Sequence, residues 1–283
     1  MGRWQLSLLT SLAMLAFAAN SLLCRLALKP GLIDPASCVS LRLASGAAVL
    51  WLLLRARGSG QRRGGDWYSA AALFIYAAAF SFAYLSLGVG VGALLLFGAV
   101  QATMLAAGYR GGERPGPGQG FGLAFALAGL VYLARPGLAA PPSLGAALML
   151  AAGVAWGVYS LRGRGASDPL RATAGNFLLA APLALLFNLP FLPQLHLTPA
   201  GALYALTSGA VTSGLGYVIW YAALKGLTAT RAAIVQLSVP VIAAFGGVLL
   251  LDETLTPRLV TASCAILGGV ALAILGRQKR RLV

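Results

Sequence analysis

One arginine stands inside an apolar stretch whose other residues are suited to hydrocarbon. The stretch is SCVSLRLASGAAVLWLLL at residues 37–54, and the arginine is Arg42. A guanidinium in a bilayer core costs at least about 2.5 to 3.5 kcal/mol on insertion scales, so some interaction must offset it. Two interpretations are open. Arg42 faces an internal cavity and attracts a carboxylate, or it is capped by helix-end carbonyls or paired with Asp34 and anchors the outer end of a helix.

Other polar and aromatic residues in the apolar stretches are candidates for the wall of such a cavity. Tyr76, Phe80 and Tyr84 recur every four residues, which puts three rings on one face of a helix. Gln236 stands one turn before Pro240, and a proline there frees a backbone carbonyl to line a cavity. Aromatic stripes are also consistent with ordinary packing. The candidate cavity residues are Asn20, Arg42, Tyr76, Phe80, Tyr84, Gln101, Trp156, Tyr159, Asn176, Tyr217, Gln236 and Pro240.

The sequence offers no set of residues typical of catalysis or of cofactor binding. The chain has one histidine, His196, and no phosphate-binding loop. We therefore expect no catalytic residue, no metal and no cofactor. Proton relays in membranes normally use a carboxylate at depth, but all six acidic residues are expected in loops or at helix ends. They are Asp34, Asp66, Glu113, Asp168, Asp252 and Glu253.

The elements that position these residues are predicted to be membrane helices. Of the 283 residues, 59% are hydrophobic and 10% charged, and the mean hydropathy is +0.84, far from the values of a soluble domain. Apolar runs of about 20 residues, the length that crosses a bilayer, recur along the chain. They predict ten transmembrane helices, at residues 4–24, 36–54, 67–87, 91–109, 119–135, 143–161, 169–187, 198–222, 230–250 and 257–276.

The net charge of +15 is divided unevenly between alternate loops. Sixteen of the 21 lysines and arginines fall on the side of the amino terminus, and four fall on the opposite side. This positive-inside pattern predicts an all-α, multi-pass protein of the inner membrane with both termini cytoplasmic. Topology and contact with anionic lipid therefore explain the basic charge, and we expect no nucleic-acid partner.

The chain contains an internal repeat. AFAANSLLCR at 16–25 matches AWGVYSLRGR at 155–164, and residues 92–114 lie over 232–254. Each copy has five predicted spans. Because five is odd, the second copy enters the membrane from the opposite face, which makes an inverted repeat. The two copies are predicted as residues 1–139 and 140–283.

Both copies begin their second span in the same way. The dipeptide Asp-Pro occurs at 34–35 and again at 168–169, and each aspartate is expected to cap a helix that begins at the proline. Asn176 is the repeat counterpart of Arg42, and the polar character of both favours an inward-facing position. Since the first span has a counterpart later in the chain, we expect it to remain as a span rather than be cleaved as a signal peptide.

Together these features resemble the drug/metabolite transporter superfamily, in its ten-span EamA-like group. The resemblance rests on the doubled five-span plan, on AWGVYS at 155–160, on GER at 112–114 after the fourth span and on DET at 252–254 after the ninth. The amino-acid exporter branch called YddG is the most similar branch. The first copy departs from the aromatic-Gly pattern, with Phe17 followed by alanine. The resemblance implies two inverted five-helix repeats around a central cavity, with Trp156 at that cavity.

The resemblance and the cavity candidates predict a carrier of small metabolites that works by alternating access. The expected substrate is a neutral or aromatic amino acid: Arg42 or a helix amino terminus suits its carboxylate, amides or carbonyls its ammonium, and rings its side chain. Transport is expected to be facilitative, and export is implied by the resemblance alone. The alternatives are an exporter of lipophilic cations by proton antiport and a membrane scaffold that transports nothing. The expected partners are a small-molecule substrate and bilayer lipid, with a monomer favoured.

Overall fold

The structure is a computed structural model, and it describes residues 2–58, 64–110, 117–134, 141–163, 166–224, 226–227 and 235–278. These residues are nearly all helical. The helices of the first half are α1 (Arg3–Leu28), α2 (Pro35–Ala56), α3 (Trp67–Ala83), α4 (Val89–Arg110) and α5 (Pro117–Ala134). Those of the second half are α6 (Ser143–Gly163), α7 (Pro169–Asn188), η1 (Leu189–Gln194), α8 (Pro199–Thr207), η2 (Ser208–Leu215), α9 (Gly216–Leu224), α11 (Ser238–Leu251) and α12 (Pro257–Gln278).

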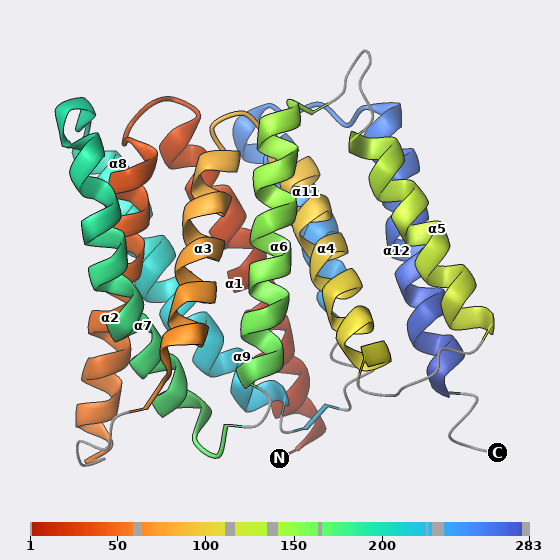
Figure 1. Cartoon of the computed structure of the whole chain (residues 1–283), viewed down its shortest axis with the longest axis horizontal. Coiled ribbons are helices and arrows are strands. Elements are labelled where there is room, and N and C mark those ends of the chain that lie inside the picture. Colours follow the sequence, from red (N-terminus) through yellow and green to blue (C-terminus); the bar gives the residue numbers. More distant parts are fainter. Residues whose placement is uncertain are drawn as a thin grey trace.

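The helices stand side by side and run up and down in one bundle (Figure 1). Helices α5 and α12 pack against each other at one edge of it, and the start of α1 lies at the same end of the bundle as the end of α12 (Figure 1). Every range predicted as a span contains a helix, although within 230–250 the described helix starts only at Ser238. The predicted boundary at residues 139 and 140, and the repeat residues Glu113 and Arg164, lie outside the described residues.

Length and composition qualify six stretches of the described chain to cross a membrane. They are Trp4–Leu28, Pro35–Ala56, Val89–Gly108, Ser143–Gly163, Pro169–Gln194 and Pro199–Ala223. Shorter apolar helices lie at Trp67–Ala83, Gly120–Leu133, Ser238–Leu251 and Pro257–Leu272. The chain is therefore a multi-pass membrane protein, and the number of ten spans stays a prediction.

The predicted Asp-Pro caps are confirmed. Asp34 accepts a hydrogen bond from the backbone N–H of Ser37 at 2.8 Å, and Asp168 accepts one from that of Arg171 at 3.2 Å. In each helix the proline occupies the first turn, where its missing N–H would have no partner in any case. The local sequence alone therefore sets the starts of α2 and α7.

A widened helix lies in the middle of one of the two long helical runs of the second half, each of 26 residues. The run extends from Pro199 to Leu224, and its central eight residues, Ser208–Leu215, form the π-helix η2. Such segments are rare and occur frequently at functional sites. Here the segment turns three hydroxyl side chains, those of Ser208, Thr212 and Ser213, into the protein interior, where all three are buried.

Helix α2 meets η2 at very short range. Gly209 has no room for a side chain, because a Cβ there would overlap the backbone carbonyl of Arg42. On α2, a Cβ at Gly46 would lie 2.5 Å from a ring carbon of Phe177. These two glycines bring the backbone of α2 close to η2 and α7, and they hold Arg42 against the hydroxyl groups of η2.

Candidate functional site

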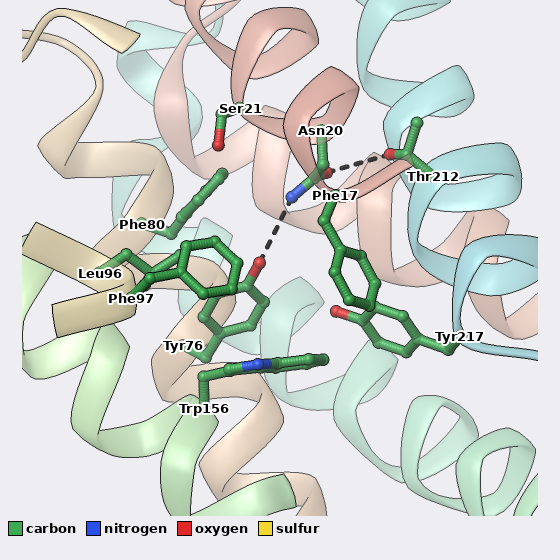
Figure 2. A pocket seen from close by; sticks show the side chains of 10 residues that line it. All are labelled: Phe17, Asn20, Ser21, Tyr76, Phe80, Leu96, Phe97, Trp156, Thr212 and Tyr217. Carbon is green, nitrogen blue, oxygen red and sulfur yellow. Dashed lines mark hydrogen bonds between the residues drawn. The ribbon is translucent and has the colours of Figure 1, made fainter. Parts of the chain in front are cut away.

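A small cavity lies inside the bundle, between α1, α3, α4, α6, η2 and α9 (Figure 2). Its volume is about 20 Å³, which suits a single water molecule and excludes an organic solute. The lining residues are Phe17, Asn20, Ser21, Tyr76, Phe80, Leu96, Phe97, Trp156, Thr212 and Tyr217. Five of the sequence candidates are among them: Asn20, Tyr76, Phe80, Trp156 and Tyr217.

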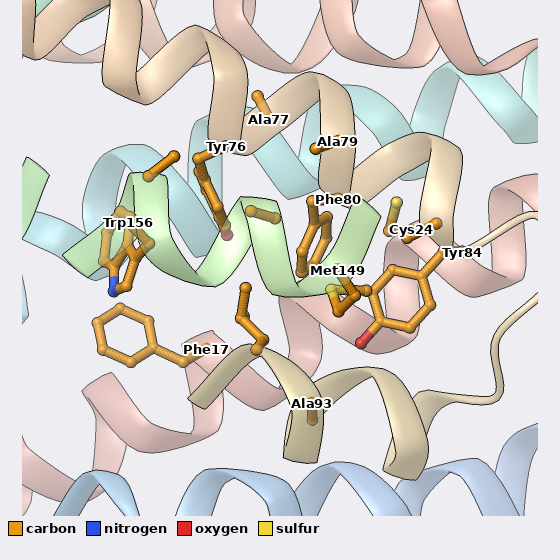
Figure 3. Close-up of a cluster of buried hydrophobic side chains, with 14 of the residues drawn as sticks. Phe17, Cys24, Tyr76, Ala77, Ala79, Phe80, Tyr84, Ala93, Met149 and Trp156 are labelled. Carbon is orange, nitrogen blue, oxygen red and sulfur yellow. The ribbon is translucent and has the colours of Figure 1, made fainter. Parts of the chain in front are cut away.

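Aromatic rings make up most of the wall, and Trp156 is at their centre. Its ring centroid lies 4.9 Å from that of Tyr76, 4.8 Å from that of Tyr217 and 6.3 Å from that of Phe17. A row of ring contacts continues along α3. The ring centroids of Tyr76 and Phe80 are 5.3 Å apart, and those of Phe80 and Tyr84, which meet edge to face, are 4.7 Å apart (Figure 3). The predicted aromatic face of α3 thus extends one side of the cavity along the helix.

One polar side chain crosses the apolar wall. Asn20 accepts hydrogen bonds at Oδ1 from the hydroxyls of Ser208, at 2.7 Å, and Thr212, at 3.2 Å. Its Nδ2 donates to the Tyr76 hydroxyl at 3.3 Å (Figure 2). Asn20 therefore connects α1 to both η2 and α3. Its amide oxygen, Oδ1, accepts both of the hydrogen bonds from η2.

Arg42 lies directly behind this wall and is 1% exposed. Its Nη2 donates to the Tyr76 hydroxyl at 2.9 Å and its Nε to the Ser213 hydroxyl at 3.4 Å. The guanidinium carbon is 5.0 Å from the ring centroid of Tyr76 and 4.8 Å from that of Phe80, within cation–π range. In the described chain its third nitrogen, Nη1, has no hydrogen-bond partner.

Neither of the anchoring partners considered for Arg42 is found. Its hydrogen bonds go to two side-chain hydroxyls rather than to carbonyls. Asp34 is engaged elsewhere, because it caps α2 and also accepts from the backbone N–H of His196 at 3.2 Å. The structure thus joins Arg42 to Tyr76 of the cavity wall, although Arg42 itself is not one of the lining residues.

The described carboxylates all lie at helix ends. Asp34, Asp66 and Asp168 cap the starts of helices, and Asp252 follows the last residue of α11. Glu253 accepts from the backbone N–H of Val89 at 2.7 Å, and its Oε1 is 3.5 Å from Nε of Arg25. Arg42 therefore has no acidic neighbour among the described residues of the cavity.

Asp66 forms part of a contact between α3 and α6. It accepts from the hydroxyl of Ser69 at 2.6 Å and from Nη2 of Arg162 at 2.8 Å. Burial raises the pKa of this carboxyl, but the hydrogen bonds from Ser69 and Arg162 outweigh burial and hold its pKa below the ordinary value.

Several sequence candidates lie near the cavity without lining it. Tyr159 stacks on Trp156 with ring centroids 5.5 Å apart. Tyr84 packs beyond Phe80, and its hydroxyl donates to the carbonyl of Val89 at 3.5 Å. Gln101 is 3% exposed, one turn beyond the lining residue Phe97, and its Nε2 has no partner in the described chain.

Three other candidates are not brought to the cavity. Asn176 accepts from the backbone N–H of Asp66 at 2.9 Å and so supports the start of α3. Gln236 and Pro240 are buried around the start of α11. Pro240 is the third residue of the described helix α11, where its missing N–H removes no hydrogen bond within the helix.

The sequence candidates omit Phe17, Ser21, Leu96 and Thr212. A signal for Phe17 was present, because the repeat alignment puts Phe17 over Trp156, and the two rings meet edge to face across the cavity. Thr212 had no such signal. It and Tyr217 are five residues apart, and the π-helical hydrogen-bond spacing brings positions i and i+5 towards one side of the helix.

Comparison with known proteins identifies relatives of both the sequence and the fold. Residues 143–275 match the EamA-like transporter family. A Pseudomonas aeruginosa protein named "Uncharacterized protein PA1977" is 58% identical over 278 residues, covering 96% of each chain. An "Uncharacterized transporter" of Archaeoglobus fulgidus is 30% identical over 161 residues, covering 54% of this chain and 56% of that protein.

A further relative and a solved structure are also similar to this chain. "Uncharacterized transporter YoaV" of Bacillus subtilis is 24% identical over 139 residues, covering 47% of this chain and 48% of that protein. A protein crystal structure at 24% identity superposes with a TM-score of 0.70, covering 97% of this chain and 98% of the other. That structure shares the overall fold along nearly the whole length.

Proposed function

We propose that this chain is a transporter of the EamA-like family, whose model matches residues 143–275, and that it carries small carboxylate-bearing metabolites across the inner membrane. Neutral and aromatic amino acids are the first candidates. The carrier is proposed to act by facilitated alternating access and to export its substrate. The observation that carries the proposal is Arg42, a buried cation without an acidic neighbour in the described cavity, behind a wall of rings.

Burial without a counter-ion makes Arg42 costly to keep. An arginine that is 1% exposed loses most of its hydration, and two neutral hydroxyls recover only part of it. Intramembrane cations of this kind mark substrate paths more often than they serve stability. A substrate carboxylate accepts from a guanidinium in a bidentate pair, which is stronger than the present bonds to neutral hydroxyls. A substrate carboxylate would therefore bind the Arg42 guanidinium more strongly than the Tyr76 hydroxyl does.

The cavity of about 20 Å³ must expand to admit such a substrate. Contacts at both ends of the bundle support an occluded state. At one end, Arg25 donates to the carbonyls of Tyr84, at 2.7 Å, and Leu85, at 3.0 Å, and pairs with Glu253. At the other end, Arg162 joins α6 to Asp66 of α3. Alternating access is proposed to release one set of contacts at a time.

The architecture is proposed to be ten transmembrane helices in two inverted repeats, residues 1–139 and 140–283. The matched Asp-Pro caps of α2 and α7 support a repeat. So does the meeting of Phe17 and Trp156, which occupy the same repeat position. Besides the six long apolar stretches, the other four proposed spans contain α3, α5, α11 and α12. We propose a monomer with both termini cytoplasmic.

A transport assay tests this function. We expect purified protein in liposomes to take up radiolabelled phenylalanine and other neutral amino acids without an imposed pH gradient. Arg42→Ala should lower uptake by about tenfold or more, because a paired charge at a binding site is worth about 2 to 5 kcal/mol. Arg55→Ala is the matched control, since Arg55 is on the same helix but exposed.

The opposite results separate the alternatives. Uptake that requires a proton gradient, or that is confined to organic cations, would support the lipophilic-cation exporter. The described cavity favours that alternative less, because it has rings for a cation but no carboxylate, and Arg42 repels positive charge.

A further inference from the structure

Two buried nitrogen donors, one beside the cavity and one a helical turn beyond a lining residue, have no partner in the described chain. Arg42 Nη1 and Gln101 Nε2 are buried donor atoms without a partner in the described chain. Both residues are more than nine-tenths buried, at 1% and 3% exposed. Unpartnered buried donors are costly, and each is satisfied best by a ligand that only accepts hydrogen bonds. An ionised carboxylate is such a ligand.

Two acceptors beside the cavity, Oδ1 of Asn20 and the hydroxyl oxygen of Tyr76, are already in use. Oδ1 of Asn20 takes two hydrogen bonds, from Ser208 and Thr212. The hydroxyl oxygen of Tyr76 takes two more, from Arg42 and from Nδ2 of Asn20. A primary ammonium brings three donors that all need acceptors. It would have to compete for these two oxygens with donors that the protein already supplies.

The positive charge of Arg42 also favours an anion over a zwitterion. Arg42 is the charged side chain beside the cavity in the described chain, and the described carboxylates are engaged at helix ends. A zwitterion that puts its carboxylate on Arg42 also brings an ammonium close to the guanidinium. The two cations repel each other in a site of low dielectric. A monoanion brings no second cation and neutralises the arginine.

We propose that the site selects the carboxylate and the apolar ring of its substrate and offers no counter-charge to an α-ammonium. The preferred substrates are then monocarboxylates with an aromatic or branched apolar tail, ahead of the amino acids of the same shape. The carboxylate takes the place of the Tyr76 hydroxyl on Arg42, and the tail packs among Trp156, Tyr217 and Phe17. This inference rests on the proposed function, because it uses the same cavity and the same arginine.

Three compounds with one ring and different charges test the inference. They are 3-phenylpropionate, an anion; L-phenylalanine, a zwitterion; and 2-phenylethylamine, a cation. Their Kd values are measured by isothermal titration calorimetry on the purified full chain at neutral pH. We expect 3-phenylpropionate to bind at least about tenfold more tightly than phenylalanine, and 2-phenylethylamine not to bind.

Each other outcome has a distinct meaning. Phenylalanine binding as tightly as 3-phenylpropionate, or more tightly, would overturn the inference and leave the proposed function in place. Binding of 2-phenylethylamine alone would overturn both in favour of a cation exporter. Binding of none of the three would contradict the proposed function itself, together with the inference that rests on it.

Variants of Arg42 show whether the preference comes from that residue. Arg42→Gln should remove the difference between the anion and the zwitterion, whereas Arg55→Gln on the exposed end of the same helix should preserve it. Arg42→Lys keeps the charge and should keep a reduced preference for the anion, which serves if the glutamine variant fails to fold. A tenfold preference that survives in folded Arg42→Gln would overturn the inference.

Discussion

Tyr76 is the residue on which the site converges. Its hydroxyl accepts from both Arg42 and Asn20, so one oxygen connects α3 to α2 and α1. Its ring also lies under the Arg42 guanidinium and against Trp156. Sequence spacing alone predicted that its ring shares a helix face with Phe80 and Tyr84, because i, i+4 spacing fixes a helix face. The hydroxyl contacts could not be predicted, since they join residues 34 and 56 positions apart.

At the same scale, Trp156→Ala is expected to weaken substrate binding. Trp156 contacts the rings of Tyr76, Tyr217 and Phe17, and each aromatic pair is worth about 0.5 to 1.5 kcal/mol beyond its buried area. We expect Kd to rise about tenfold or more, measured by calorimetry with the best-binding compound. Trp51→Ala, at a half-exposed tryptophan of α2, is the control and should leave Kd unchanged. An unaffected Kd in Trp156→Ala would remove this ring from the site.

Asp66 predicts a pH dependence of stability. Its pKa is lowered in the folded chain, so its contribution is present above the unfolded value of about 4 and is lost as the pH falls through the lower folded value. The melting temperature in detergent should therefore fall between pH 5 and pH 3, by a small amount because the pair with Arg162 is largely exposed. Asp66→Asn should flatten this part of the profile. An identical slope in the variant would assign the effect to other groups.

At the scale of helices, some features follow from local sequence and others do not. The starts of α2 and α7 were predictable, because an aspartate followed by a proline determines a helix start within one turn. The π-helix η2 was not, since GAVTSG reads as an ordinary small-residue stretch of a span. It packs closely against α2, and Thr212, one of its residues, lines the cavity.

The contact between α2 and η2 gives a prediction at this scale. Gly209→Ala adds a methyl group where the carbonyl of Arg42 stands, so the two backbones must separate. We expect a loss of about 1 to 3 kcal/mol in unfolding free energy, the usual cost of overpacking, and weaker binding because Arg42 moves. Gly268→Ala on α12 is the control. Its Cβ meets nothing within 4 Å, so removal of a helical glycine should be neutral or slightly stabilising.

For the molecule as a whole, the ion pairs at the two ends of the bundle differ in how far they are exposed. The pair of Arg25 and Glu253 is largely buried, with side chains 11% and 16% exposed, and it ties α1 to α11. The pair of Arg162 and Asp66 is 43% and 44% exposed. Sequence reasoning identified Arg25 and Glu253 as repeat positions but could not pair them, because the pairing depends on how the two halves meet.

Weakening the buried pair is expected to open its end of the bundle. Glu253→Gln removes the charge but retains an oxygen for the N–H of Val89. Cys24, next to Arg25 and 1% exposed, should then react faster with a water-soluble maleimide, by about tenfold, in a background without Cys38 and Cys264. Asp168→Asn at a distant helix cap is the matched control. Equal labelling rates in the two variants would argue that the pair does not hold this end closed.

The lone charge of Arg42 also bears on the direction of transport. A carrier that returns empty moves, in each cycle, only the charge of its substrate. For the monoanion proposed above, a potential of 100 mV, negative inside, is worth about 2.3 kcal/mol per molecule moved outward. That energy sustains a concentration ratio of about 50, whereas a zwitterion gains nothing from the potential. A carrier of this anion would thereby export it on membrane voltage alone.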